Sequence, residues 1–394
     1  MAGARMSSHD DRRLAARHKS ATGRRSPEVL IVGPYPPPLG GVSSHVQRAT
    51  IALQDAGYTV GVLNHFTSEI DNSPVVGTLR RNPVLYFLKL RKAHGPVVHY
   101  HHAGRLSLLL AAALARPKRD GRWLVTIHNH SLTRSLESSR SSRRLVRWAL
   151  GRFDQVIAVS REIAQTLERH EVNAPIVVMP AYIPAAPGKS HRSVRSLARD
   201  DVEWSGVTLI VSAYRVSRFN GGGDIYGLDI AVKIFAALAR EGLDLRLAVF
   251  LAHAPRGRWA RRYLDSTLAC VNPELQPRLR LLVGETLLPA FDQRVVYLRP
   301  TRTDGDAVSV REALDAAVPV VASDVVWRPP PAQALPIEDI DLWHEAVAME
   351  IERVRARART PPVTDLQRHH DRTGDEVVAL YRSQLDRISS AAAS

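Results

Sequence analysis

Cysteine is nearly absent from this chain of 394 residues, in which Cys270 is the only one. A single cysteine excludes an internal disulfide and a metal site built from several thiolates, and it is typical of a reducing compartment. We therefore expect a cytoplasmic protein. Long hydrophobic runs are missing as well: the longest, 106–115, is shorter than the about 20 residues that a transmembrane helix needs. We interpret this run as a buried helix.

The N-terminal segment has no apolar stretch of the kind that a secretory signal requires. Residues 1–27 hold seven basic and two acidic side chains and show no apolar periodicity, so we predict a disordered basic tail. The net charge of +15 would suit nucleic acid, anionic lipid or phosphorylated substrates as partners. Because the sequence shows no helix-turn-helix, finger or aromatic platform, nucleic acid is not expected among them.

The sequence does contain a regular alternation of short apolar, β-branched runs with helical patterns. Such alternation indicates parallel sheets that are covered by helices on both faces. Strands are expected at 29–32, 59–63, 97–100, 123–127, 156–159, 176–179, 207–213, 246–251, 279–283, 295–298 and 319–322. Helices are expected at 42–56, 106–115, 161–171, 228–240, 308–316, 338–357 and 373–389.

The alternation weakens between Ile183 and Ser205, where prolines and a mixed polar stretch are typical of a domain boundary. We predict an α/β protein with two doubly wound, Rossmann-like domains that face a cleft, since ligands of such sheets bind at the carboxyl ends of strands. The predicted parts are an N-terminal domain at 28–190, a linker at 191–205, a C-terminal domain at 206–365, and a C-terminal helical segment at 366–394 that packs back toward the N-terminal domain.

Two adjacent glycines, Gly40 and Gly41, close a proline-rich loop directly before the predicted helix 42–56. Adjacent glycines let the backbone approach a ligand closely, and the start of a helix favours an anion. A tight turn without a ligand is the alternative. The stretch differs from the dinucleotide fingerprint G-x-G-x-x-G, so a redox cofactor is not expected.

Histidines gather at the ends of two predicted strands. His128 follows the strand 123–127, at the end where ligand sites form, although an ordinary surface histidine would look the same. The run 99–102 reads His-Tyr-His-His and could suggest a metal. Neighbouring residues of a strand point to opposite faces, however, and no matched carboxylate accompanies the run. We therefore expect no metal site.

A third stretch places two carboxylates around a helix start. Asp304 lies in a polar loop after the strand 295–298, and Glu312 lies about one and a half turns into a helix that begins near Ala307. The free amide groups at that helix start can hold a phosphate. Both carboxylates can face the same cleft and accept hydrogen bonds from sugar hydroxyls. A phosphate site next to carboxylates that bind hydroxyls is what a nucleotide sugar requires.

Two arginines follow the strand 207–213: Arg215, and Arg218 three residues further on. Arginine forks suit diphosphate oxygens and can offset charge on a leaving nucleotide. Solvated loop arginines are the alternative interpretation.

Taken together, these stretches resemble the retaining glycosyltransferases of the GT-B fold, family four (glycosyl transferases group 1), over about residues 28–390. The resemblance is carried by the opening strand with Gly40 and Gly41, by 153–160, and most specifically by 299–329. It implies two facing domains, a nucleoside-diphosphate sugar as co-substrate, and neither a metal nor another cofactor.

The resemblance also implies roles for single residues. Asp304 and Glu312 match two glutamates of the family, of which the first contacts the transferred sugar and the second the nucleotide ribose. His128 matches a histidine near the reacting carbon, and Arg215 an arginine that neutralises the diphosphate. Expected catalytic residues are His128, Asp304 and Glu312. Expected donor-binding residues are Gly40, Gly41, Arg215, Arg218, Gly305, Ala307, Val308, Ser309 and Glu312.

Three positions depart from the family's pattern. Asp304 is one methylene shorter than the usual glutamate. Tyr226 stands where the family has a lysine, so that one phosphate-binding cation is missing, with Arg218 as a candidate replacement. Ala317 stands where a glycine is usual, which costs about 1 kcal/mol if this residue adopts a left-handed conformation.

The sequence thus predicts a hexosyl-transferring enzyme that moves a sugar, with retention, to a glycan or lipid-linked acceptor in cell-envelope or exopolysaccharide synthesis. A nucleotide-sugar epimerase of the same architecture and a non-catalytic, transferase-like partner protein stay open as alternatives. The basic stretch from Arg134 to Arg152, with Trp148, could bind the anionic inner face of a membrane and make the protein peripheral there. A solvated helix face is the alternative.

Overall fold

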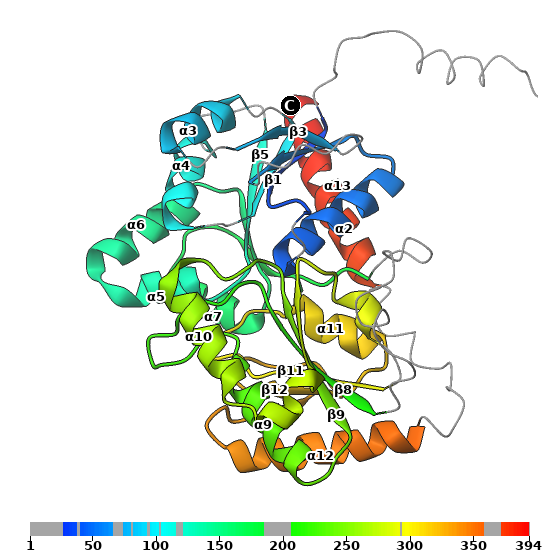
Figure 1. Cartoon of the computed structure of the whole chain (residues 1–394). Coiled ribbons are helices and arrows are strands. Elements are labelled where there is room, and N and C mark those ends of the chain that lie inside the picture. Colours follow the sequence, from blue (N-terminus) through cyan, green and yellow to red (C-terminus); the bar gives the residue numbers. More distant parts are fainter. Residues whose placement is uncertain are drawn as a thin grey trace, which may run out of the picture.

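The structure is a computed structural model with two α/β domains, one above the other in Figure 1. It describes ten stretches of the chain, and all statements below concern these: 27–37, 40–65, 74–79, 82–92, 95–101, 104–115, 121–184, 206–291, 294–357 and 372–393. The predicted tail at 1–27 and the predicted linker at 191–205 fall almost wholly outside the described residues.

The N-terminal domain is built on a parallel sheet of seven strands in the order β3-β2-β1-β4-β5-β6-β7. The order reverses between β1 and β4, which places a topological switch point at the centre of the sheet. The strands are β1 (Val29–Gly33), β2 (Val60–Asn64), β3 (Val75–Thr78), β4 (Val97–His101), β5 (Arg122–Ile127), β6 (Gln155–Ala158) and β7 (Ile176–Val178).

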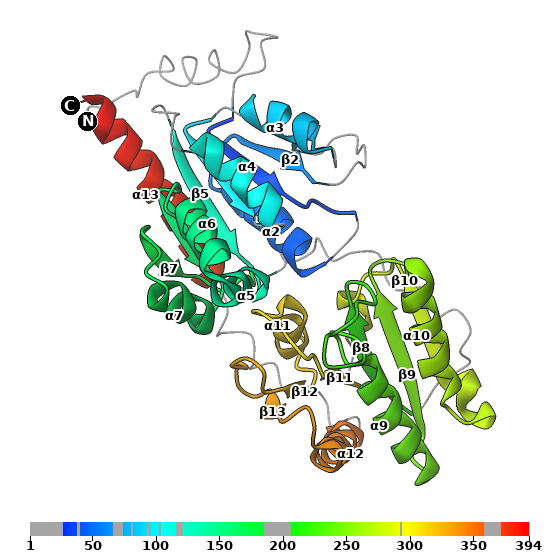
Figure 2. The same ribbon diagram turned by 90° about the vertical axis from the view of Figure 1, so that its left-hand side faces the viewer.

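The C-terminal domain repeats this plan with six parallel strands in the order β10-β9-β8-β11-β12-β13, with its switch point between β8 and β11. Figure 2 shows the two sheets side by side, with their helices around them. The strands are β8 (Val207–Ala213), β9 (Leu245–Leu251), β10 (Leu279–Val283), β11 (Val295–Arg299), β12 (Val320–Ser323) and β13 (Gln333–Leu335).

Helices cover both faces of each sheet, because alternate residues of a buried strand enter different cores. In β1, Leu30 and Val32 belong to one core, whereas Val29 and Ile31 belong to the core on the other face. The helices of the N-terminal domain are α2 (Gly41–Asp55), α3 (Pro83–Arg91), α4 (Arg105–Ala115), α5 (Ser131–Ser138), α6 (Arg140–Leu150) and α7 (Arg161–Arg169). Those of the C-terminal domain are α9 (Leu228–Arg240), α10 (Gly257–Ala269), η1 (Pro273–Arg278), η2 (Leu288–Ala290), α11 (Val308–Asp315) and α12 (Ile340–Arg357).

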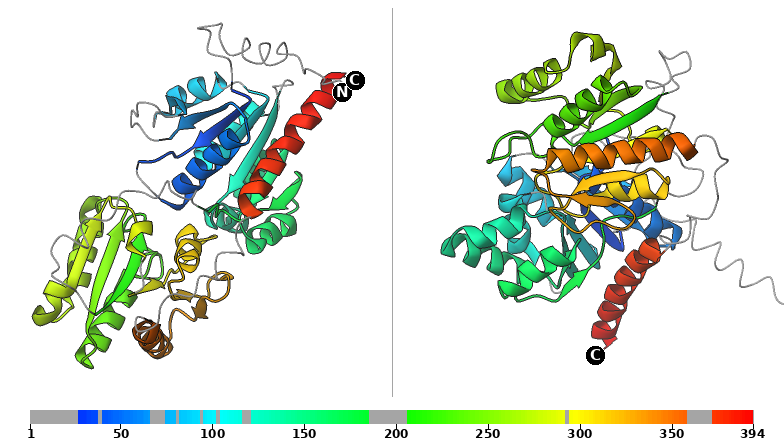
Figure 3. Two further views of the ribbon diagram at one scale, coloured as in Figure 1. Left: turned by 90° about the vertical axis from the view of Figure 1, so that its right-hand side faces the viewer. Right: turned by 90° about the horizontal axis from the view of Figure 1, so that it is seen from below.

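The last helix, α13 (Arg372–Ala393), lies against the N-terminal sheet rather than the domain that precedes it in sequence (Figure 3). Its Val377 and Tyr381 are buried in the same core as Val29 and Leu124. The hydroxyl of Tyr381 also forms a hydrogen bond with Nδ1 of His99 on β4. The described part of the chain therefore begins, with β1, and ends, with α13, on the N-terminal domain.

The predicted fold class, two doubly wound α/β domains, is confirmed. Every predicted strand and helix is present, and each begins within two residues of its predicted start. The structure adds elements that the apolar pattern did not reveal: β3, α3, α5, α6, α10 and β13. Among the described residues, no helix combines the length and apolarity that crossing a membrane requires.

Candidate functional site

A cavity of about 1220 Å³ lies between the two domains. It is bounded by the loops that follow β1 and β5 in the N-terminal domain, and by those that follow β8, β9, β10 and β11 in the C-terminal domain. Both switch points therefore open into one space, as expected for ligand sites of such sheets. We call this space the interdomain cavity.

Most of the residues that the sequence predicted for the site line the interdomain cavity. Arg218 does not line it: its backbone pairs with Asp224 in a turn, and its side chain is exposed. Arg218 therefore lies outside the interdomain cavity, unlike the other predicted donor-binding residues. The predicted residues that line the cavity are Gly40, Gly41, His128, Arg215, Asp304, Gly305, Ala307, Val308, Ser309 and Glu312.

Two glycines allow the domains to approach each other across the cavity. A Cβ atom on Gly40 would lie 2.7 Å from the ring of Tyr214 in the C-terminal domain. A Cβ atom on Gly305 would lie 2.2 Å from the carbonyl oxygen of His128 in the N-terminal domain. Only glycine fits at such distances, so both residues serve the closed arrangement of the two domains.

Glu312 is buried and forms an ion pair across the domains. The Nη2 group of Arg48, on α2, donates a hydrogen bond to its Oε1 atom. The other end of the same guanidinium donates to the carbonyl oxygen of Ile183 at 2.9 Å. The carboxylate that was predicted to hold the nucleotide ribose thus faces a cation from the opposite domain.

Other acidic groups around α11 bind the segment that leaves the N-terminal domain. Asp306 accepts a hydrogen bond from the backbone amide of Ala181 at 2.9 Å, and its other oxygen accepts one from Arg311 at 2.7 Å. The hydroxyl of Tyr182 donates to Asp315. These contacts attach α11 to the N-terminal domain while its first turn faces the cavity.

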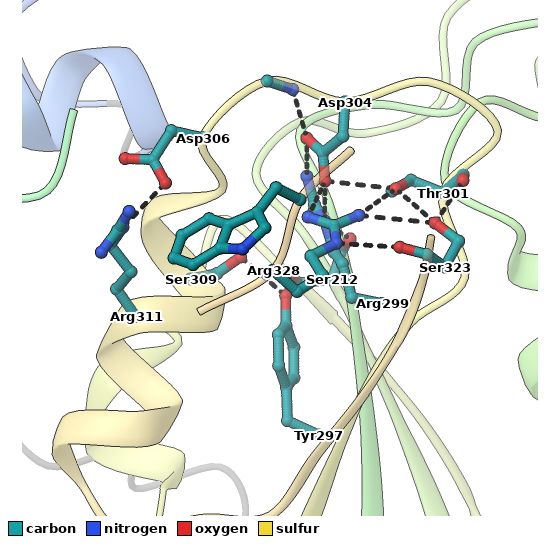
Figure 4. A network of polar contacts seen from close by, with 12 residues as sticks. Ser212, Tyr297, Arg299, Thr301, Asp304, Asp306, Ser309, Arg311, Ser323 and Arg328 are labelled. Atoms are coloured by element: carbon teal, nitrogen blue, oxygen red, sulfur yellow. Dashed lines mark hydrogen bonds and ion pairs between the residues drawn. The ribbon is translucent and has the colours of Figure 1, made fainter. Parts of the chain in front are cut away.

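Asp304 is held by a dense polar network (Figure 4). Arg299 approaches both of its oxygens, at 3.0 Å each. Arg328 donates to Oδ2 at 3.0 Å and the Thr301 hydroxyl donates to the same atom at 3.1 Å, while the amide of Gly305 donates to Oδ1. Although burial opposes ionisation, the two arginines hold the pKa of Asp304 well below its usual range.

This geometry differs from the role that the resemblance implies for Asp304. A carboxylate has about four lone-pair sites, and the protein's own donors occupy them with five hydrogen bonds. In Figure 4 the side chain of Asp304 points to Arg299 and Arg328. Asp304 is therefore an anchor for two arginines in this structure.

Positive charge also gathers where β8 and β9 end. Arg215 and Arg256 line the interdomain cavity with exposed side chains, and His253 lies close to them. Burial lowers the pKa of His253, and the charges of Arg256 and Arg215 lower it further. This corner of the cavity suits an anion.

Behind the cavity, four histidines form a buried cluster: His45, His99, His101 and His128. Nε2 of His128, which lines the cavity, lies 2.8 Å from Nδ1 of His101. Burial lowers the pKa of His45 to about 4 and that of His99 to about 3, so both rings are neutral at pH 7. In the described part of the chain, no set of three or more side chains is arranged to hold a metal ion.

Sequence reasoning missed several cavity residues, among them the arginines Arg48, Arg256 and Arg299. A signal was present for Arg299, because a charged residue that ends an otherwise apolar strand lies where ligands bind. A signal was also present for Arg48, which lies seven residues after Gly41 and so on the same face of α2. Nothing in the local pattern marks Arg256.

Comparison with known proteins gives a family match in the N-terminal domain. Residues 39–185 match the family Glycosyltransferase Family 4. No curated protein matches the chain by sequence.

Solved structures resemble nearly the whole chain at low sequence identity. Sucrose-phosphate synthase from Thermosynechococcus elongatus has a TM-score of 0.65 and 19% identity, over 93% of this chain and all (100%) of that one. HepE from Anabaena, solved with UDP and glucose, has a TM-score of 0.61 and 12% identity, over 93% of this chain and 98% of that one. An α,α-trehalose-phosphate synthase from Burkholderia xenovorans, solved with glucose-6-phosphate, has a TM-score of 0.61 and 14% identity, over 91% of this chain and 99% of that one.

These likenesses extend over both domains and the cavity between them, so they show the arrangement of the whole chain. Identities of 12–19% show the fold alone, whereas the family match gives the class of enzyme. Residues 39–185 thus match glycosyltransferase family four, and the described chain has the two-domain GT-B fold.

Proposed function

We propose that the protein transfers a sugar, with retention of the anomeric configuration, from a nucleoside-diphosphate sugar to a glycan or lipid-linked acceptor. One observation carries the proposal: Glu312, Arg215 and the first turn of α11 all line one cavity between the domains. The cavity thus brings a carboxylate for hydroxyl groups next to two elements that bind phosphate. Of the solved structures, one holds UDP and glucose and another UDP-2-fluoro glucose, which fits a donor of this class.

The diphosphate of the donor would lie at the start of α11. The N-cap residue Ala307 offers no side-chain cap, and so the first amides of the helix are available to an anion. Arg215 lines the same cavity. Aimed at the oxygens that gain charge as the nucleotide leaves, these groups would stabilise the departing diphosphate.

The acceptor would enter from the side of the N-terminal domain, where His128 lines the cavity. Glu312 would hold the ribose, once its ion pair with Arg48 makes room for a hydroxyl. Because arginines and helix amides supply positive charge at the leaving group, we propose that transfer needs no metal ion. Transfer that stops in EDTA and returns with Mg²⁺ would refute this part of the proposal.

Transfer from labelled donors tests the proposal. With UDP-, GDP- and ADP-sugars offered alongside a membrane lipid extract, Glu312→Ala and Arg215→Ala should each lower transfer at least about tenfold, since each removes a charge-assisted contact. Arg218→Ala, an exposed arginine outside the cavity, is the matched control and should keep full transfer. If Glu312→Ala and Arg215→Ala both keep full transfer, the assignment is wrong.

The same assay separates the alternatives. A nucleotide-sugar epimerase would turn over the donor in the absence of any acceptor. A transferase-like protein without activity would show no heat of donor binding in calorimetry. The anomeric configuration of the product, read by nuclear magnetic resonance, tests retention.

A surface on α6 supports a place at the membrane for this reaction. Arg140, Arg144 and Trp148 follow each other at four-residue spacing on one exposed stripe, and Leu145 lies beside them. Trp148 is 48% exposed. Arginines that attract anionic lipid, next to an aromatic anchor, are typical of a helix that lies on a membrane surface.

Helices α3 and α4 lie on the same side of the N-terminal domain as α6 (Figure 1), and both carry exposed apolar side chains. α4 packs against both α6 and α3, and Val84, Leu88 and Leu106 are about half exposed. We propose that α3, α4 and α6 rest on the inner face of the membrane and bring a lipid-linked acceptor of cell-envelope or exopolysaccharide synthesis to the cavity.

Sedimentation with vesicles tests the membrane surface. The protein should sediment with vesicles of phosphatidylglycerol and phosphatidylcholine at 20 mM salt, and only in part at 150 mM salt. The triple variant Arg140→Gln, Arg144→Gln, Trp148→Ala should hardly sediment with them at either salt concentration. Arg261→Gln with Arg262→Gln, on the exposed face of α10, is the control and should sediment like the unchanged protein. No sedimentation at low salt would end the membrane proposal while leaving the transfer reaction untouched.

A further inference from the structure

Arg299 is a buried cation at the edge of the interdomain cavity. It is the last residue of β11, an otherwise apolar strand, and its side chain is 11% exposed. Removing an arginine from water is costly unless its charge is paired and its donors are used. The contacts of Arg299 therefore bear on its role.

The position of Arg299 is fixed between the end of β8 and the start of α11. Its Nη1 group donates to the carbonyl oxygen of Ser212, the residue before the last of β8, at 3.3 Å. Tyr297, two residues earlier and thus on the same face of β11, bonds the hydroxyls of Ser212 and Ser309 at 2.7 Å each (Figure 4). Arg299 consequently lies between Arg215 and the first turn of α11, the two elements assigned to the diphosphate.

The charges of the network do not cancel. Asp304 pairs with Arg299 and with Arg328, so one negative charge faces two positive charges. Arg328 is 1% exposed on its side chain and does not line the cavity, whereas Arg299 does. Of the two arginines, Arg299 is therefore the one that can offer its charge to a ligand in the cavity.

Arg299 also keeps donors for a ligand. A guanidinium has five N–H groups, and contacts within the described part of the chain use three of them, two with Asp304 and one with Ser212. The guanidinium carbon lies 5.3 Å from the centre of the Tyr226 ring, a distance typical of a cation–π contact. The bidentate carboxylate and the ring hold the group rigid, so little rotamer entropy is lost when it binds an anion.

We propose that Arg299 binds the diphosphate of the donor as a second cation beside Arg215. Tyr226 stands where the family resemblance has a lysine, and it offers Arg299 a ring instead of supplying a charge itself. The positive charge comes from β11 rather than from the start of α9. This inference rests on the proposed function, because it assumes a nucleoside-diphosphate donor in the interdomain cavity.

Calorimetric titration of the full chain tests the proposal with UDP, GDP and ADP, and with uridine, guanosine and adenosine as the matching probes without phosphate. Arg299→Gln should weaken binding of the diphosphate that the unchanged protein prefers about 10- to 100-fold, as expected for loss of a charge-assisted hydrogen bond. Its affinity for the corresponding nucleoside should change less than about threefold, because the loss is confined to the phosphates.

Arg328→Gln is the matched control. It removes the other arginine of the same carboxylate, from a position outside the cavity, and should weaken the diphosphate by less than about threefold. Thermal unfolding of both variants reports whether each still folds. A second variant, Tyr226→Lys on the Arg299→Gln background, should recover part of the lost affinity, because it returns a cation to the adjacent position.

The outcomes separate the inference from the proposed function. If the unchanged protein binds none of the three diphosphates, the proposed function fails and the inference with it. If a diphosphate binds the unchanged protein and binds Arg299→Gln equally well, the inference is overturned while the proposed function stands. The same holds if Arg328→Gln loses as much affinity for the diphosphate as Arg299→Gln does.

Discussion

Arg48 on α2 and Glu312 on α11 are 264 residues apart in sequence and form one buried ion pair that bridges the two domains. Their side chains are 11% and 10% exposed. Removing one partner of a buried pair costs about 3–5 kcal/mol while the other stays buried and unpaired. A separation of the two domains would return Glu312 to water, so we expect the cost to fall on closure rather than on unfolding.

We therefore predict that Arg48→Gln shifts the protein toward an open form. Small-angle X-ray scattering should show a larger radius of gyration for this variant in the absence of ligand, with the unfolding temperature little changed. Arg147→Gln, which breaks an exposed pair with Glu171 inside the N-terminal domain, is the control. Equal radii for Arg48→Gln and the unchanged protein would show that the pair does not govern closure.

Gly305 gives a second test of closure. In Gly305→Ala the new Cβ atom would lie 2.2 Å from the carbonyl oxygen of His128, so the domains could no longer meet as they do here. Overpacking of this kind costs about 1–3 kcal/mol, which corresponds to a loss of transfer of about 5- to 150-fold. Gly104→Ala meets only the Ser107 hydroxyl, at 3.9 Å, and should transfer normally. Full transfer by Gly305→Ala would contradict the closed arrangement as the active one.

Ala317 has the left-handed conformation, with φ of 57°, in which a side chain is strained. The sequence predicted a cost at this position, and the structure shows the conformation that causes it. Ala317→Gly should raise the free energy of unfolding by about 1 kcal/mol, which urea denaturation can measure. Ala316→Gly is the control next to it: with φ of −80° the native residue is unstrained, so the change should bring no gain. A loss of stability in Ala317→Gly would contradict the assignment of strain.

The buried histidines make stability depend on pH. In the folded chain, burial lowers the pKa of His45 to about 4 and that of His99 to about 3. The unfolded chain binds these protons below about pH 6.5, whereas the folded chain does not, so acid favours unfolding. Each histidine should lower the free energy of unfolding by up to about 1.4 kcal/mol per pH unit as the pH falls from 6.5 toward 4.

Urea denaturation between pH 7 and 5 checks this expectation, because few carboxylates take up protons in that range. His99→Gln should show a shallower dependence on pH than the unchanged protein, since one proton no longer distinguishes the two states. Parallel curves for His99→Gln and the unchanged protein would show that His99 is already charged when folded.

Much of the fold could be predicted because its strands are buried on both faces. A strand such as Val29–Gly33 must be apolar throughout, and such a run is visible without knowledge of its neighbours. The apolar pattern did not reveal α5 and α6 because few of their buried residues are apolar: Leu132 and Leu136 in α5, and Val146, Ala149 and Leu150 in α6. Their apolar stripe is therefore narrow. The short edge strand Val75–Thr78 was missed because it has too few residues to show a pattern.

Site residues could be predicted where their place after a strand puts them at the edge of the sheet that binds ligands. His128 follows the end of β5, Glu312 lies on the helix after β11, and both line the cavity. The pairing of Glu312 with Arg48 was beyond the sequence, because it depends on how two domains meet. The ion pair of Asp304 with Arg328 was also beyond the sequence, since Arg328 reaches the carboxylate from 24 residues further on, by way of β12.

Because α13 packs on the N-terminal sheet, the chain crosses between the domains twice, once between β7 and β8 and once between α12 and α13. A protease that cuts at the first crossing alone would not separate the halves. The downstream fragment would still carry Val377 and Tyr381 in the core of the upstream fragment. The two pieces should therefore stay together without a covalent bond, and fragments expressed from two genes split at this point should complement each other.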